Sequence, residues 1–145
     1  MWSAWRTYLD CNVSLRRGEV FVFLILHRVE NPDYQVFTQT RWHISLCRVL
    51  EGTEPTLLHQ LFDELERALL RDQYFAFELP PVGWEHPPRY VHFGIEGPLL
   101  ETALLLQRNL RLRLVAHLSP ATCGGPGRLH LAVPVSGRNV PDAAV

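Results

Sequence analysis

The sequence contains no lysine: all 14 of its basic residues are arginine, and 15 acidic residues bring the net charge to −1. A chain so close to neutral has no overall basic field that would draw it to nucleic acid, so any anion must bind at a local site. At such a site the contact would come from a planar arginine guanidinium or from a neutral donor.

The sequence has only three cysteines, and their spacing shows no disulfide or metal-binding pattern. Cys11, Cys47 and Cys123 are an odd number with no C-x-x-C spacing, which argues against a disulfide framework and favours a reducing compartment. The first residues lack the basic and apolar regions of a signal peptide, and the longest apolar run, residues 20–26, is too short to cross a bilayer. We therefore expect a monomer in the cytoplasm or nucleus, away from membranes.

Metal-binding patterns are also missing. His86 and His92 lie six residues apart, which matches no zinc spacing, and no H-E-x-x-H occurs. Gly-rich phosphate loops are absent too, and "CGGPG" at 123–127 is typical of a turn. We expect no metal and no cofactor.

Hydrophobic periodicity predicts two helices among short strands. The predicted helices span residues 53–73 and 98–110. The predicted strands span residues 19–29, 41–50, 74–82, 89–97, 111–119 and 128–136, with loops at 83–88 and 120–127.

The order of these elements gives the expected fold class. The second half of the chain echoes the first, which predicts an α+β domain of two similar lobes, with antiparallel sheets, one main helix in each lobe and a central cleft. A single domain would span residues 1–136, and residues 137–145 would form a C-terminal tail.

Two of the predicted strands carry a His-x-Ser motif. The first, His43-Ile44-Ser45, lies in "RWHISLCRV", and the second, His117-Leu118-Ser119, lies in "VAHLSPAT". On a strand, residues two apart point to the same face, so each histidine would stand beside its serine. If the two lobes pack around a pseudo-twofold axis, both pairs would face one cleft.

Such a site has a clear chemistry. One neutral histidine can take a proton from an attacking hydroxyl, and one charged histidine can protonate a leaving oxygen. Serine hydroxyls can donate hydrogen bonds to the non-bridging oxygens of a phosphate. This chemistry suits phosphodiester cleavage and uses no metal.

With these motifs the sequence resembles the 2H phosphoesterase superfamily, which has the LigT-like fold. That family carries two H-x-[ST]-hydrophobic motifs, and the similarity in element order covers residues 19–136. The use of serine in both motifs is similar to the branch that trims the 3′ ends of small spliceosomal RNAs. The resemblance implies that His43 and His117 are the acid–base pair, that Ser45 and Ser119 bind phosphate, and that no metal takes part.

One alternative alignment places the second motif elsewhere. His130 in "RLHLAVPV" could replace His117, but Ala132 would then stand where the family has a hydroxyl. We prefer His117 on this ground, although Pro120 follows that motif where an aliphatic residue is usual. His130 remains the residue to test if His43 and His117 lie apart.

Three further residues are candidates for substrate contact. Arg41 and Arg48 flank the first motif and could approach phosphate, although solvated charges at strand ends explain them as well. Trp84 lies in a predicted loop, where an aromatic ring could stack on a base or pack against the protein.

The sequence therefore predicts a phosphodiesterase that cleaves RNA or oligonucleotides at 2′,5′-, 3′,5′- or 2′,3′-cyclic linkages. One rival keeps the site but changes the substrate to a small nucleotide signal, a 2′,5′-oligoadenylate or cyclic dinucleotide, as in a viral or phage antagonist of host defence. A second rival is a nucleotide- or RNA-binding module without turnover. A third is an interaction protein in which both motifs are accidental.

Overall fold

The computed structural model describes residues 3–31, 35–38, 40–80, 83–86, 89–120 and 129–134, with the backbone alone at 3 and 84–86. The strands are β1 (Ser3–Arg16), β2 (Glu19–Glu30), β3 (Val36–Phe37), β4 (His43–Leu50), β5 (Phe75–Leu79), β6 (Trp84–His86), β7 (Tyr90–Gly94) and β8 (His130–Pro134). The helices are α1 (Pro55–Leu65), which a π-helical turn extends over Glu66–Leu70, and α2 (Gly97–Arg113), followed by a 3₁₀ turn at Val115–His117.

All eight strands belong to one antiparallel sheet. Seven of them follow the order β5-β1-β2-β4-β8-β7-β6, and β3 pairs with β2. The strands β1 and β2 form a long hairpin whose turn holds Arg17 and Gly18 at φ 52° and 77°, as a type I′ turn requires. The α+β class expected from the sequence is confirmed.

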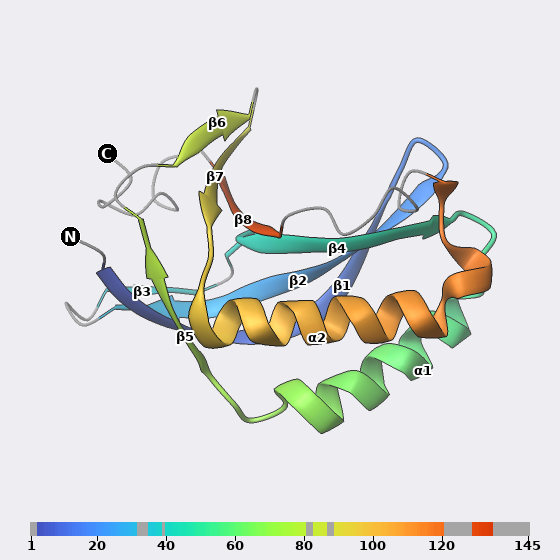
Figure 1. Ribbon diagram of the computed structural model, residues 1–145, viewed down its shortest axis with the longest axis horizontal. Coiled ribbons are helices and arrows are strands. Elements are labelled where there is room, and N and C mark those ends of the chain that lie inside the picture. The colour runs from blue at the N-terminus through green and yellow to red at the C-terminus, as the bar shows by residue number, and fades with distance from the viewer. Residues whose placement is uncertain are drawn as a thin grey trace.

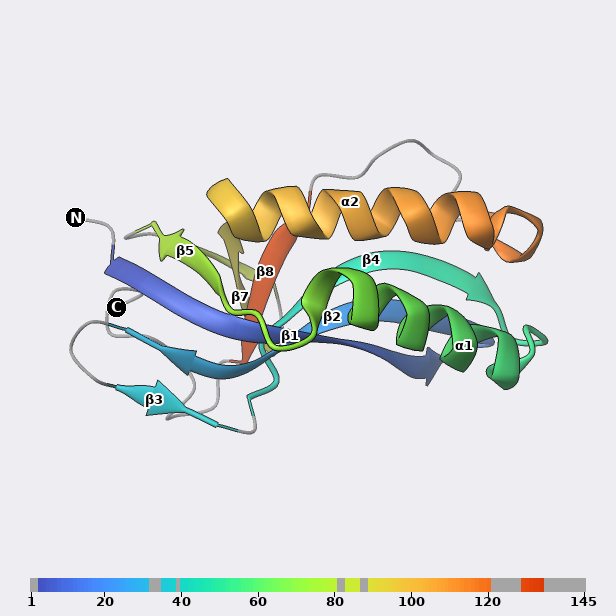
Figure 2. The ribbon, with the colours of Figure 1, turned by 90° about the horizontal axis from the view of Figure 1, so that it is seen from below.

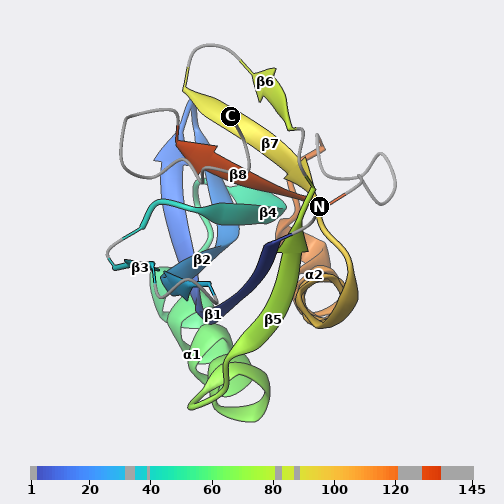
Figure 3. The ribbon, with the colours of Figure 1, turned by 90° about the vertical axis from the view of Figure 1, so that its left-hand side faces the viewer.

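Both helices cover the same face of the sheet. Figures 1 and 2 show α1 and α2 side by side against it, and Figure 3 shows the strands curving above them. Alternate residues of β2 fill the interface: Val22, Leu24 and Leu26 are fully buried, whereas Phe23 and Ile25 point to the other side and are partly exposed. We call that other side the open face.

A buried glutamine ties α2 to the strand that carries the first motif. Gln107 donates a hydrogen bond from Nε2 to the carbonyl oxygen of Leu46, at 2.9 Å. Its neighbours on the helix, Leu106 and Leu110, are fully buried, and so is Ile44 on β4. Trp42, which precedes His43, has no exposed surface and belongs to the core.

Most of the predicted elements are confirmed, but the expected strand at 111–119 is wrong. The segment completes α2, passes through the 3₁₀ turn and forms an isolated bridge to the sheet between Leu118 and Val49 instead of a strand. The alternating leucines 110, 112 and 114 imitate a strand. Leu110 and Leu114 instead continue the buried stripe of the helix, and Leu112 is 69% exposed.

Two other elements differ from expectation. The long strand β1 was not foreseen, although the alternation of Trp5, Thr7 and Leu9, all buried, is a strand pattern. The predicted loop at 83–88 contains the short strand β6, which pairs with β7. The tail expected at 137–145 and the loop at 121–127, with Cys123, lie outside the described residues.

Candidate functional site

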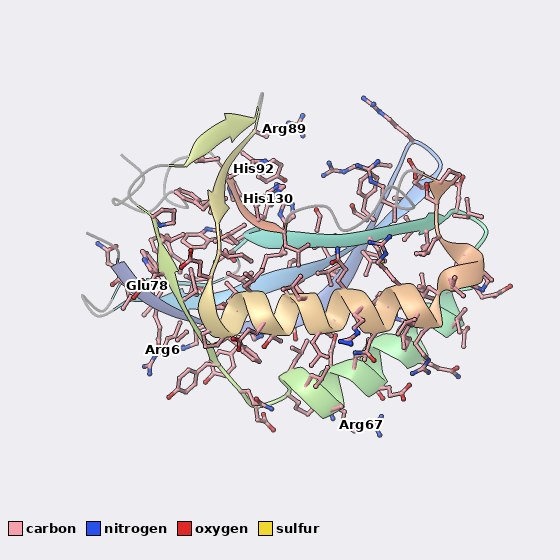
Figure 4. All side chains as sticks on the ribbon, in the orientation of Figure 1. Arg6, Arg67, Glu78, Arg89, His92 and His130 are labelled. Atoms are coloured by element: carbon pink, nitrogen blue, oxygen red, sulfur yellow. The ribbon has the colours of Figure 1, made fainter. Side chains whose placement is uncertain are left out.

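Three histidines meet on the open face, where β4, β8 and β7 run side by side. His43 pairs with Ala132, and Ala132 pairs with His92, so these residues form a row across the three strands. His130 lies two residues before Ala132 and therefore on the same face. Figure 4 shows His92 and His130 on the side of β4 that faces away from α2.

The register of β4 and β8 relates two His-x-small motifs by a local twofold axis. Ile44 pairs with Leu131, and in an antiparallel pair a twofold axis through these residues maps His43 onto His130. The same operation maps Ser45 onto Ala132. His43 and His130 are thus diagonal neighbours, about 7–8 Å apart at Cα.

Contacts on three sides hold the ring of His43. Its Nδ1 donates a hydrogen bond to the carbonyl oxygen of Arg41 at 2.9 Å, because a carbonyl can only accept. The edge of Tyr90 and the ring of Phe23 stand against it, with ring centroids 5.1 Å and 5.4 Å away. These contacts fix the ring and leave Nε2 as its proton acceptor.

The surroundings of His43 favour its neutral form. Burial lowers the pKa of the imidazole, while the hydrogen bond to the Arg41 carbonyl acts in the opposite direction. The positive charges of Arg16 and His130 lower this pKa further. His43 is therefore suited to accept a proton near neutral pH.

His130 sits between the first motif and a third histidine. Its ring centroid lies 4.4 Å from that of His92, with the ring planes tilted by 42°. Its positive charge is one of the causes that lower the pKa of His43. Extending the β4–β8 register by one residue places His130 opposite Ser45, whose side chain is exposed. Two histidines and one serine hydroxyl thus border the same patch of the open face.

The structure does not bring His43 and His117 together. His117 ends the 3₁₀ turn, and its neighbour Leu118 bridges to Val49, six residues along β4 from His43. At about 3.3 Å per residue the two histidines lie roughly 20 Å apart along the strand. One phosphate cannot reach both, since proton transfer needs hydrogen-bond distance. The structure therefore separates His117 from His43, and the histidine that it places near His43 is the alternative candidate, His130.

Ser119 has a different environment from the one expected. It is 3% exposed, its backbone N–H donates to the carbonyl oxygen of Arg48 at 2.9 Å, and its hydroxyl donates to the Glu19 carboxylate. These contacts fasten the segment after α2 to the far end of β4 and β2. The side chain is buried there and does not join Ser45.

The structure places the three candidates for substrate contact in different surroundings. Arg41 contributes its carbonyl to His43, and its side chain is exposed. Arg48 lies on the open face with its guanidinium carbon 4.7 Å from the centroid of the Phe21 ring. Trp84 belongs to β6 and pairs with His92 through the backbone, and its side chain lies outside the described part.

Sequence reasoning did not include Tyr90 and His92 in the site. Their alternation in "RYVHFG" placed both on one face of a strand, which was a usable signal. The alternation alone does not predict that this strand pairs with β8, and it is this pairing that brings His92 beside His130.

Cys47, four residues after His43 on β4, is a buried thiol. It is 6% exposed, and burial raises the pKa of its thiol to about 12, so the thiolate is strongly disfavoured. Within the described ranges no group of three or more His, Cys, Asp or Glu side chains is arranged to hold a metal ion.

Comparisons with protein-family models, with curated proteins and with solved structures find no match to this chain. In the described part of the chain no helix is long and apolar enough to span a membrane. A function for the histidine cluster must therefore be argued from its geometry.

Proposed function

We propose that the chain is a metal-independent phosphodiesterase of RNA or oligonucleotides, with His43 and His130 as its acid–base pair. The observation that supports this most strongly is the local twofold relation of the two histidines across β4 and β8. Phosphodiester cleavage needs one group to accept a proton and another to donate one on opposite sides of a phosphorus, and a twofold pair supplies both.

In this mechanism His43 is the general base. Its Nε2 takes the proton of the attacking hydroxyl, either a ribose 2′-hydroxyl or a water, and the oxygen forms a bond to phosphorus. His130, in its charged form, gives a proton to the oxygen that leaves as its bond to phosphorus breaks. Ser45 donates a hydrogen bond to a non-bridging oxygen, and His92 supports the ring of His130 from the other side. Each proton transfer is worth about 10²- to 10⁴-fold in rate.

The same relation supports a proposed place in the 2H phosphoesterase superfamily, with its two-lobed LigT-like fold. The strands β5, β1, β2 and β4 would form one lobe and β8, β7 and β6 the other, meeting where the two histidine strands pair. The second motif would then read His130-Leu131-Ala132. Ala132 has no hydroxyl at the position where that family has serine or threonine, which departs from the family pattern.

That alanine favours a second candidate function. A site with one serine instead of two has one fewer donor to the phosphate, which suits a nucleotide- or RNA-binding module with little or no turnover. Product formation distinguishes the two candidate functions: the phosphodiesterase would cleave an oligonucleotide, whereas the binding module would bind it and release it intact.

The test of the proposed function is a substrate panel in buffer containing EDTA. Single-stranded 3′,5′-linked RNA, a 2′,5′-linked oligoadenylate, a ribonucleoside 2′,3′-cyclic phosphate and a cyclic dinucleotide are incubated with the protein, and the products are separated. We expect cleavage of at least one RNA or oligonucleotide substrate at a rate that EDTA does not change. Loss of cleavage in EDTA, restored by a divalent cation, would contradict the mechanism.

Restoring the missing hydroxyl gives a sharper test of the motif. Ala132→Ser is expected to raise kcat/KM up to about tenfold, because a hydrogen bond to a charged group contributes ~1.5 kcal/mol. The matched control is Ala132→Cys, which has a similar size but only a weak donor. If the serine variant is no faster than the cysteine variant, Ala132 does not stand at a phosphate-binding position.

A further inference from the structure

The helix α2 carries a second apolar stripe on the side that faces away from the sheet. Its buried residues, Leu106 and Leu110 among them, pack on the sheet, and Figure 2 shows the sheet and α1 on one side of the helix. At about 100° per residue, the opposite side of the helix presents a different set of side chains. They are Glu101, Leu104, Leu105, Arg108, Leu112 and Val115, and we call them the outer stripe.

The four apolar side chains of the outer stripe are exposed to solvent. Leu104 and Leu105 are 44% and 42% exposed, and Leu112 and Val115 are both 69% exposed. All six residues of the outer stripe line one hollow on the surface. Because a helix that is apolar on two sides is typically covered on both, and because contiguous exposed apolar patches mark interaction sites, the outer stripe has the composition of an interface.

The two charges of the outer stripe are placed so that the stripe complements itself. Glu101 lies three residues before Leu104, and Arg108 lies three residues after Leu105. Both charged side chains are exposed, and neither forms an ion pair among the described residues. If a second copy of α2 packs antiparallel across a twofold axis between Leu104 and Leu105, residues equally far from the axis on either side face each other. Glu101 of each copy then faces Arg108 of the other.

The same twofold relation matches the apolar residues of the outer stripe. Leu104 of one copy faces Leu105 of the other, so four leucines form an apolar centre between the two ion pairs. Leu112 faces Gly97, where the position of a Cβ has no described atom within 4 Å, so a leucine side chain has room there. The antiparallel order also brings the positive N-terminal end of each helix dipole toward the negative C-terminal end of the other, which is favourable.

We propose that the outer stripe of α2 is an interface through which two copies of this chain form an antiparallel, twofold-symmetric dimer. A second copy fits this surface because the stripe carries both of the charges that it needs to pair with itself. The monomer expected from the sequence would instead leave the four apolar side chains in water. Since α2 and the histidine cluster lie on opposite sides of the sheet, the dimer leaves both clusters open, and the inference does not depend on the proposed function.

Sedimentation equilibrium of the full chain, at concentrations from about 1 to 500 μM, measures dimer formation. A single helix pair is a small interface, and small interfaces give weak complexes, so we expect a dissociation constant in the micromolar range. Leu105→Gln should raise this constant about 10- to 100-fold, because each dimer loses two leucines from its apolar centre. Leu15→Gln, at an exposed leucine on β1, is the matched control and should dimerise as the wild type does. Circular dichroism should show that both variants are folded.

Two charge variants test the antiparallel arrangement. Glu101→Arg places an arginine opposite Arg108, and Arg108→Glu places a glutamate opposite Glu101, so each variant alone should dimerise at least about fivefold more weakly than the wild type. Mixed in equal amounts, the two variants should form a heterodimer about as tight as the wild-type dimer, because both ion pairs are then restored. Glu78→Arg makes the same change on the face of β5 that points away from the helices, and it should have no effect.

The outcomes of these measurements divide clearly. A chain that stays monomeric at the highest concentration overturns the inference, and the outer stripe would then belong to a contact with a different protein. A dimer that is as tight in Leu105→Gln as in the wild type also overturns it, since the two copies then meet elsewhere. A dimer that needs Leu105, but whose two charge variants do not pair when mixed, overturns the antiparallel arrangement. Two weakened variants that pair when mixed support the dimer, whether or not the chain cleaves RNA.

Discussion

Replacement of His43 by alanine is expected to lower kcat/KM for RNA cleavage by about 10²- to 10⁴-fold, the effect of losing a general base. The residue is placed for that role by three features together: a fixed ring, a free Nε2 and a lowered pKa. The measurement is the initial rate on the best substrate of the panel under kcat/KM conditions.

The matched control for this variant is His59→Ala. His59 is exposed on α1, on the other side of the sheet, and its loss should leave the rate within about twofold of the wild type. Circular dichroism should show that both variants are folded. A His43→Ala protein that is folded and keeps more than about a tenth of the wild-type rate is not consistent with His43 as the base.

The second large effect is expected at His130 and not at His117. Loss of His130 removes the proposed general acid, so kcat/KM should fall by about 10²- to 10⁴-fold relative to the wild type. The kcat/KM of His117→Ala should stay within about twofold of the wild-type value, because His117 lies beside the opposite end of β4 from His43. The two variants carry the same chemical change in the two candidate motifs, so each serves as the control for the other.

The reverse result would move the site. If His117→Ala is inactive and His130→Ala is normal, the reaction takes place at the far end of β4, next to Ser119 and Glu19. Equal losses in both would point to an effect on folding, which the melting temperatures of the two variants would reveal. The double variant His43→Ala/His130→Ala should be little slower than either single variant, since residues that act as one unit are not additive.

The fold class and the first motif could be predicted because they depend on local periodicity. The alternation of His43, Ile44, Ser45 and Leu46 places imidazole and hydroxyl on one face, and the structure has them so, with Ile44 and Leu46 buried. The leucines of α1 repeat at helical spacing, and Leu58, Leu61 and Leu65 are buried as predicted. Such patterns follow from the geometry of a single element.

The histidine that lies near His43 could not be predicted, because its place depends on which strand pairs with β4. Residues 111–119 and residues 128–136 both contain a histidine among alternating apolar residues, and the hydroxyl of Ser119 made the first of them look like the better match. The structure pairs the second of them with β4: Leu110 and Leu114 are buried as part of α2, and Leu131 and Val133 are buried in the sheet. Pairing between residues as far apart in sequence as His43 and Ala132 leaves no local pattern in the sequence.

The central claim is that His43 and His130 transfer protons on one phosphate, and the pH dependence of kcat/KM tests it most directly. A base must be neutral to act, and the pKa of His43 is lowered, so the acid limb should lie below about pH 6.5. We expect the rate to fall on the acid side in the wild type, and this fall to be absent from the residual activity of His43→Ala. His130→Ala keeps the base, so it should be slower than the wild type but retain the acid limb. An acid limb that persists unchanged in His43→Ala would contradict the account.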